Sequence, residues 1–225
     1  PMKFEENQIY HIYNQGNNQR QVFFEEANYL FFLWKMRAYL HPFGDFISWC
    51  LMPNHFHWQF FVKKVVVPRH LLWKNIDSVE YQRRLKQYGK KAKPVDNHFK
   101  RKADRNELVD LNQAIGTLEQ SYTSAINKQK KWSGSLFRKG CHAKDGFIPE
   151  FLTLMKHGRE DPRFQLGNDY GFTCFQYIHQ NAVAANLAVT ITSYQWSSAR
   201  DYAGLRRGTM CNLDRGRAIL DFLPQ

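Results

Sequence analysis

The segment Trp49-Cys-Leu-Met-Pro-Asn-His-Phe-His-Trp-Gln-Phe-Phe61 decides the fold. It is rich in aromatic residues and places two histidines, His55 and His57, two positions apart. Successive side chains of a strand point to opposite faces, so this spacing predicts a strand with both imidazoles on one face and Phe56 on the other. Two adjacent imidazoles either bind a metal ion or are half-buried side chains satisfied by hydrogen bonds. The spacing alone leaves both alternatives open.

The residues before this segment predict another strand and a helix. Ile9, Tyr10 and Ile12 belong to a run of β-branched and aromatic residues that is typical of a strand. Further on, apolar side chains recur at helical spacing until Pro42 and Gly44 end the pattern. The expected order is a strand at 8–14, a loop at 15–20, a helix at 25–41, a strand at 44–50, a short break, and the histidine strand ending near 62.

Helical and basic segments follow the histidine strand. From Glu107 to Asn127, apolar residues return at steps of three and four, which predicts a long amphipathic helix. A basic turn from Lys128 to Gly140 then leads into another strand. The remaining expected elements are a helix at 149–159, a loop at 160–171 and a helix at 172–187. Together these elements predict an α+β fold, with an antiparallel β-sheet carrying the histidines on its face and helices packed on one side.

The charge of the chain indicates a polyanionic partner. Its 225 residues include 32 Lys and Arg against 20 Asp and Glu, a formal net charge of +12. Such a balance favours nucleic acid. No segment approaches the roughly 20 apolar residues needed to cross a bilayer, so no membrane partner is expected. The first residues lack the apolar stretch of a secretory signal, and we expect a cytoplasmic location. The four scattered cysteines favour neither a zinc knuckle nor a disulfide framework.

Most of the excess charge lies in residues 63–105. This stretch holds 14 Lys and Arg against 4 Asp and Glu, which is +10 of the +12. Residues 77–88 within it have helical character that ends at Gly89. The stretch is either a solvated surface or an arm that contacts phosphates. In the second case its aromatic residues would stack on unpaired bases: Trp73, Tyr81, Tyr88 and Phe99.

A second informative pair lies in the last predicted helix. Tyr177 and Asn181 are four residues apart, so on a helix they share one face. If that face lies over His55 and His57, the set comprises two nitrogen ligands, one amide oxygen and a hydroxyl that attacks a phosphate. The alternative is a tyrosine at the edge of the core and an asparagine near the end of the helix. Spacing alone leaves both open.

Several segments resemble known transposases. His55-Phe-His57, preceded by Leu51-Met-Pro-Asn54, resembles the histidine, hydrophobic, histidine (HUH) motif of single-tyrosine transposases. Four further segments resemble the REP-associated tyrosine transposases in the same order: residues 10–20, 134–138, 177–181 and 196–202. The resemblance covers most of residues 8–202. It implies a single HUH domain over residues 1–225 with a ferredoxin-like or RRM-like sheet, a basic insertion at about 63–105 and a C-terminal extension after about 187.

The resemblance also implies an activity and a site. By matching motifs, His55, His57 and Asn181 would bind a divalent metal ion, Mg²⁺ or Mn²⁺, and Tyr177 would be the nucleophile. The enzyme would cleave and rejoin single-stranded or hairpin DNA through a 5′-phosphotyrosine intermediate. Tyr122 is the alternative nucleophile, although Ile126 stands where a ligand would be needed.

This chain departs from the family in two respects near the site: at Ala182, and at Ala184-Ala-Asn-Leu187, which replaces the family's usual small residue and basic pattern. Ala182 follows Asn181 where the family has proline, which removes a signal that would stop the helix. Two rival functions remain: a non-catalytic module that binds single-stranded DNA or RNA, and a metal-dependent hydrolase that uses water. Monomer and homodimer both stay open. The residues expected to contact DNA are Arg20, Lys63, Lys64, Arg101, Lys102, Arg105 and Arg138.

Overall fold

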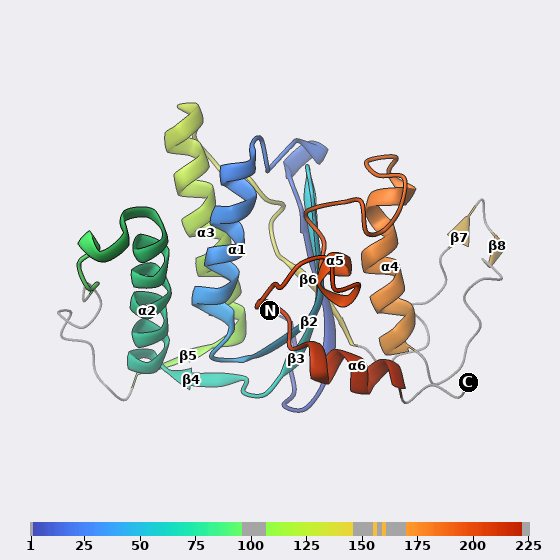
Figure 1. The fold of residues 1–225 in the computed structure, drawn as a ribbon, viewed down its shortest axis with the longest axis horizontal. Helices are drawn as coiled ribbons and strands as arrows, with labels where there is room; N and C mark the ends of the chain where they lie inside the picture. Colours follow the sequence, from blue (N-terminus) through green and yellow to red (C-terminus); the bar gives the residue numbers. More distant parts are fainter. Residues whose placement is uncertain (1, 96–106, 146–154, 157–158, 161–169, 222–225) are drawn as a thin grey trace.

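The protein has an α+β fold built on one four-stranded antiparallel sheet. The computed structural model describes residues 2–95, 107–145, 155–156, 159–160 and 170–221. The sheet stands between two groups of helices (Figure 1). Its strands are β1 (Ile9–Gln15), β2 (Gly44–Met52), β3 (His55–Val62) and β6 (His142–Asp145), in the order β2-β3-β1-β6. The fold class expected from the sequence is confirmed.

The histidine segment forms a hairpin with β2. Met52 pairs with His55, so Pro53 and Asn54 make the turn between the two strands. Phe56, Trp58 and Phe60 alternate with the histidine positions and are fully buried. They point to a core of aromatic rings, in which the ring of Phe32 lies 5.3 Å from that of Phe56. The opposite face of β3 is therefore left to the polar positions 55, 57 and 59.

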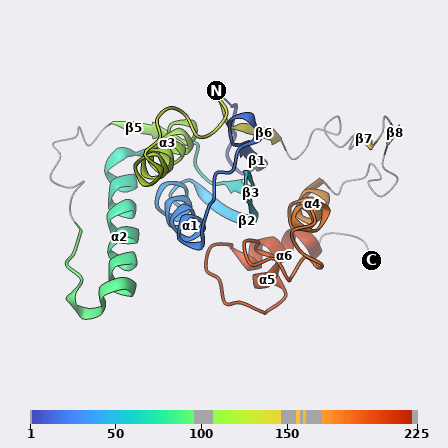
Figure 2. The same cartoon turned by 90° about the horizontal axis from the view of Figure 1, so that it is seen from above.

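Helices cover both faces of the sheet rather than one. Helices α1 (Glu26–Leu40) and α3 (Leu111–Lys130) pack on the aromatic face, and α4 (Tyr170–Ala184) lies across the histidine face. Figure 2 shows α1 and α3 on one side of the strands and α4 on the other. The one-sided arrangement expected from the sequence was wrong, because periodicity shows which residues of a helix are buried but not which sheet face covers them.

The basic insertion contains a packed helix. Helix α2 (Arg69–Tyr88) starts eight residues before the predicted Asp77, and a short 3-10 turn, η2 (Gly89–Lys91), follows it. Its buried residues Leu72 and Ile76 face α1, and Asn75 Nδ2 donates to two carbonyls of α1 at 2.8 and 3.1 Å. Strands β4 (Val66–Pro68) and β5 (Leu108–Asp110) pair and close the insertion at its base. Its inner face is therefore part of the fold.

The remaining elements refine the predicted boundaries. A helix was expected at 149–159, but Met155–Lys156 (β7) and Arg159–Glu160 (β8) pair as short strands. The other residues of that prediction lie outside the described part of the chain. Helix α4 stops at Ala184 without a proline, since Asn186 adopts a φ of 57° and ends it. The other short elements are η1 (Asn17–Gln19), α5 (Ala199–Tyr202) and α6 (Leu213–Asp221).

The C-terminal segment borders the outer strand β2. Cys50 forms an antiparallel bridge with Ser197, and Phe46 forms a parallel bridge with Cys211. The backbone N–H of Trp49 donates to Ser198 Oγ at 2.9 Å. None of the helices in the described ranges is both long and apolar enough to cross a membrane.

Candidate active site

His55 and His57 lie side by side on the face of the sheet that α4 covers. Their ring centroids are 5.0 Å apart and the rings are perpendicular, at 89°. His57 is 6% exposed and His55 is half-buried. Burial lowers the pKa of His55 to about 4. Burial also lowers the pKa of His57 well below its usual value, and the neighbouring His11 and His55 add to this shift. Both imidazoles are therefore neutral at neutral pH, the form that binds metals.

Hydrogen bonds occupy the Nδ1 atom of both rings. His55 Nδ1 lies 2.6 Å from Asn54 Oδ1. The amide of Asn54 is oriented by its Nδ2, which donates to the carbonyl of Gln19 at 3.2 Å, so its oxygen faces the ring. An amide oxygen only accepts, which places the proton of His55 on Nδ1 and leaves a lone pair on Nε2. His57 Nδ1 lies 2.8 Å from His11 Nε2. When His57 donates in this pair, its Nε2 also keeps a lone pair.

His11 is a member of this site that the sequence did not single out. It lies on β1, opposite Gln59 of β3, and is 8% exposed. Its ring stacks on that of His57 with centroids 5.0 Å apart at 27°. Strand alternation places His11 and Tyr13 on one face, and this pattern in the sequence could have indicated His11 as a candidate site residue. The register between β1 and β3 decides that His11 meets His57, and that register is not visible in the sequence.

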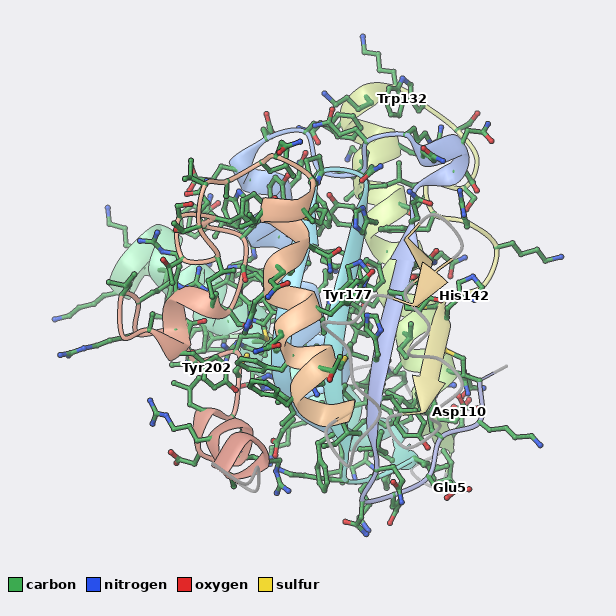
Figure 3. The ribbon with its side chains drawn as sticks, turned by 90° about the vertical axis from the view of Figure 1, so that its right-hand side faces the viewer. Glu5, Asp110, Trp132, His142, Tyr177 and Tyr202 are labelled. Atoms are coloured by element: carbon green, nitrogen blue, oxygen red, sulfur yellow. The ribbon has the colours of Figure 1, made fainter. Side chains whose placement is uncertain are left out.

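Tyr177 reaches the histidines from α4. Its ring is edge-on to His57, with centroids 5.5 Å apart at 85°, and edge-on to His11, at 5.7 Å and 73°. Figure 3 shows Tyr177 halfway along α4, over the strands. Burial raises the pKa of Tyr177 above its usual 10.0, and a hydrogen bond with the Asn181 side chain partly offsets the shift. The hydroxyl is therefore protonated at neutral pH.

Asn181 lies one turn further along α4. Its Nδ2 donates to the backbone carbonyl of Tyr177 at 2.9 Å, which leaves the amide oxygen as the atom that it offers to a ligand. Between the two, His179 turns away: it is 3% exposed and its Nε2 bonds to Ser198 Oγ at 2.7 Å. Over the described ranges, no three His, Cys, Asp or Glu side chains gather as a metal site. The structure packs Tyr177 on His57, and Asn181 lies one turn along the same helix; with His55, these four residues are the candidate centre.

The alternative nucleophile, Tyr122, lies elsewhere. It is fully buried on α3, against the aromatic face of the sheet, and its hydroxyl donates to the carbonyl of Val22 at 2.7 Å. Burial raises the pKa of Tyr122 strongly. Its ring packs on Phe23 and Phe32, with centroids 5.5 and 4.9 Å away. The structure gives this hydroxyl a role in packing and does not bring it to the histidines.

The basic residues expected to contact DNA fall into two groups. Arg138 lies at the His55 end of the sheet, because its N–H donates to Gln15 O at 2.8 Å and Gln15 pairs with His55. Arg20 belongs to the same end. Lys63 and Lys64 follow the far end of β3 and pair with acidic groups, Asp45 at 2.7 Å and Glu6 at 3.5 Å. The predicted cluster of Arg101, Lys102 and Arg105 lies outside the described residues.

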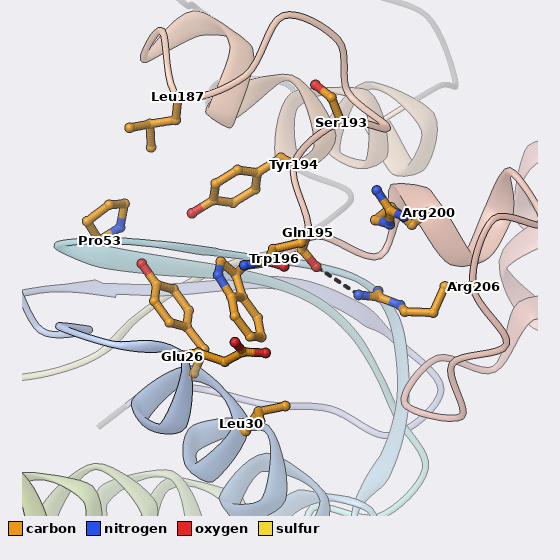
Figure 4. A pocket seen from close by; sticks show the side chains of 11 residues that line it. Glu26, Leu30, Pro53, Leu187, Ser193, Tyr194, Gln195, Trp196, Arg200 and Arg206 are labelled. Atoms are coloured by element: carbon orange, nitrogen blue, oxygen red, sulfur yellow. Dashed lines mark hydrogen bonds between the residues drawn. The ribbon is translucent and has the colours of Figure 1, made fainter.

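A separate pocket of about 730 Å³ opens at the edge of the sheet (Figure 4). It lies between the start of α1, the turn at Pro53 and the loop that follows α4. Stacked rings of Tyr29 and Trp196, 4.4 Å apart, form part of its wall. Arg206 lines it but is held by Asp201 and two carbonyls. None of the four residues of the candidate centre lines this pocket.

Comparisons with known proteins give one informative result. No family model matches this chain, and no curated protein matches it. Among solved structures, the chain is similar to a REP-associated tyrosine transposase bound to a REP hairpin, with 9% sequence identity and a TM-score of 0.51. The similarity covers 91% of this chain and 84% of that chain. The two proteins share a fold. At this identity the likeness extends no further than the fold.

Proposed function

We propose that the protein is a transposase-like DNA strand transferase, which cuts and rejoins single-stranded or hairpin DNA through Tyr177 with the help of a divalent metal ion. The observation that carries the proposal is the position of Tyr177, whose ring meets His57 edge-on while Asn181 lies one turn along the same helix. Two further findings support it. The chain carries a net charge of +12, and the transposase of similar fold was solved with a REP hairpin.

The donor atoms of the site fit Mg²⁺ or Mn²⁺. His55 donates from Nδ1 and has Nε2 to offer, His57 has Nε2 to offer when its Nδ1 donates to His11, and Asn181 has its amide oxygen. Three such ligands leave positions for phosphate oxygens. An ion held by these residues would supply positive charge that stabilises the negative charge developing on the phosphate during attack. Because imidazole is a softer ligand than Mg²⁺ prefers, we expect Mn²⁺ to support activity better.

The residues of the chain account for the covalent step. Tyr177 loses its phenol proton as its oxygen bonds to phosphorus, and the 3′ oxygen of the DNA leaves and takes up a proton. The products are a 5′-phosphotyrosine link and a free 3′-hydroxyl. The link keeps the energy of the phosphodiester, so a second 3′-hydroxyl can attack it, release Tyr177 and join two strands. The edge-on packing of the Tyr177 ring against His57 and His11 restricts the ring, which would favour this attack.

The proposal is tested by trapping the covalent link. The full chain is incubated with labelled hairpin oligonucleotides that carry single-stranded flanks, in Mn²⁺ or in a chelator. We expect a labelled band that survives denaturation, needs the metal, and is absent in Tyr177→Phe. Tyr122→Phe is the matched control and retains the band.

Other outcomes distinguish the rival functions. DNA binding without an adduct in any metal would leave a non-catalytic DNA-binding or RNA-binding module. Nicked product without an adduct would indicate a hydrolase that uses water. An adduct that persists in Tyr177→Phe and disappears in Tyr122→Phe would move the nucleophile to Tyr122.

A further inference from the structure

An exposed tryptophan lies among basic side chains at the His55 end of the sheet. Trp132 is 45% exposed and follows the C-terminal end of α3. Phe24 meets it edge-on, with centroids 5.5 Å apart at 77°. The Nζ of Lys130 lies 4.5 Å from the ring of Phe24, and the guanidinium carbon of Arg20 lies 6.0 Å from the ring of Trp132. We call these four residues the Trp132 surface; Figure 3 shows Trp132 at one extremity of the molecule.

The segment that carries Trp132 has charge of one sign. Residues 128–140 contain five Lys and Arg and no Asp or Glu. The acidic group at the rim is Glu25, and its carboxylate accepts a hydrogen bond from Gln129 Nε2 at 2.6 Å. An exposed aromatic ring among cations is a poor surface for an apolar protein partner, since the cations would lose water. It suits a strand of nucleic acid, whose phosphates attract the cations and whose bases stack on the ring.

Hydrogen bonds hold this surface in place. The N–H of Asn17 donates to Leu136 O and its Nδ2 donates to Ser135 O, both at 2.9 Å, and Arg20 also donates to Ser135 O. The turn is further tied to α3, because Asn127 Nδ2 donates to Gly134 O at 2.8 Å. A fixed ring loses little conformational freedom when a base stacks on it, so the geometry favours binding.

The same loop joins this surface to the histidine site. The N–H of Gly16 donates to Asn54 O at 2.8 Å, and Asn54 Nδ2 donates to Gln19 O at 3.2 Å. Asn54 is the residue that orients His55. A DNA strand that passes the histidines can therefore continue along residues 16–20 toward Trp132.

From these contacts we infer that the Trp132 surface binds unpaired DNA, with a base stacked on Trp132 and phosphates near Arg20 and Lys130. The inference rests on the proposed function only in naming DNA as the polyanion. The contact itself needs neither Tyr177 nor a metal ion.

The test is a binding titration of the full chain in a chelator, with a fluorescently labelled fifteen-nucleotide oligo(dT) as the probe. Stacking of one base leads us to expect Trp132→Ala to weaken binding by roughly five-fold or more. Trp132→Phe keeps a ring and stays closer to wild type. Leu205→Ala removes an apolar side chain that is 60% exposed in the C-terminal segment, and we expect it to have no effect.

Salt dependence separates stacking from charge. Trp132→Ala should leave the slope of log Kd against log salt unchanged. Lys130→Gln should lower it by about 0.7, the value for one phosphate contact on a single strand. Arg20→Gln is a second substitution of a basic residue on the same surface. Thermal melts followed by circular dichroism verify that each variant is folded.

Three results would overturn the inference: wild-type affinity in Trp132→Ala, a larger loss in Leu205→Ala, or a change of oligomeric mass instead of DNA affinity in Trp132→Ala. These results are independent of the covalent assay. Absence of a Tyr177 adduct with a Trp132-dependent affinity would reject the proposed function and retain the binding surface. An adduct at Tyr177, together with a DNA affinity that does not depend on Trp132, would retain the proposed function and reject the binding surface.

Discussion

The Nε2 atom of His11 lies 2.8 Å from the Nδ1 atom of His57, so two buried imidazoles from β1 and β3 form one hydrogen-bonded pair. A ligating histidine commonly donates its second ring nitrogen to such a partner, which fixes both the tautomer and the ring orientation. His11 is therefore placed to decide which nitrogen of His57 is available. Its role in this pair is to position His57.

Replacement of His11 should weaken metal binding. We expect His11→Ala to raise the Kd for Mn²⁺ by roughly ten- to one-hundred-fold, because His57 loses its partner. Isothermal titration calorimetry without DNA measures this directly. His142→Ala is the control, since His142 is exposed on the neighbouring strand β6 and its ring stacks on Tyr13 rather than on His57. Unchanged affinity in His11→Ala would show that His57 needs no such support.

The hydroxyl of Tyr122 should matter for stability and not for chemistry. Tyr122→Phe removes the donor to Val22 O and leaves that carbonyl without its partner. We expect the free energy of unfolding to fall by roughly 1–2 kcal/mol, measured by urea denaturation. The yield of covalent adduct should be that of the wild type. A stable Tyr122→Phe variant that forms no adduct would contradict this assignment.

The sheet was predictable because its signals are local. The aromatic residues at 56, 58 and 60 alternate with the histidine positions, and Pro53 with Asn54 marks the turn. This pattern requires a strand with one apolar face. The pairing of Tyr177 with Asn181 on one helix face followed from the helical period in the same way.

What the sequence did not reveal depends on contacts between distant segments. His11 meets His57 across 46 residues, through a register that the hydrophobic pattern does not specify. Helix α4 covers the histidine face because α1 and α3 already occupy the other. The start of α2 was missed because Leu72 and Ile76 lie among basic residues, and their packing on α1 becomes visible only in three dimensions.

An ion pair within the C-terminal segment, between Arg206 and the buried carboxylate of Asp201, should stabilise the fold. Arg206 donates to both carboxylate oxygens of Asp201, at 2.7 and 2.8 Å, and the Asp201 side chain is 1% exposed. We expect Asp201→Asn to lower the free energy of unfolding by roughly 3 kcal/mol, because the arginine loses its counter-charge. Chemical denaturation gives the value.

The matched control is an exposed pair of the same type. Asp214 lies 4.0 Å from Arg217, and its side chain is 99% exposed. Such pairs contribute little, so Asp214→Asn should change the stability by less than about 0.5 kcal/mol. Equal effects in the two variants would mean that the Asp201 pair is no stronger than a surface contact.

Glu119 should make the stability of the protein depend on pH. Burial raises the pKa of this carboxyl from 4.5 to about 7, although hydrogen bonds with Asn14 and Cys141 counteract the rise. Between pH 4.5 and 7 the unfolded chain releases the proton while the folded protein retains it, so stability falls as the pH rises through this window. A shift of this size corresponds to roughly 3 kcal/mol, and above pH 7 the contribution is constant.

Glu119→Gln should remove this loss, because a neutral amide keeps an acceptor for the Nδ2 of Asn14, which bonds to Glu119 Oε1 at 2.9 Å. We expect the variant to be more stable than the wild type at pH 8 and similar to it at pH 4, as measured by urea unfolding across the range. Glu5→Gln, at an exposed carboxyl, should follow the wild-type curve. The same decline between pH 4.5 and 7 in Glu119→Gln would show that another group causes it, and would leave the contact between α3 and β1 insensitive to pH.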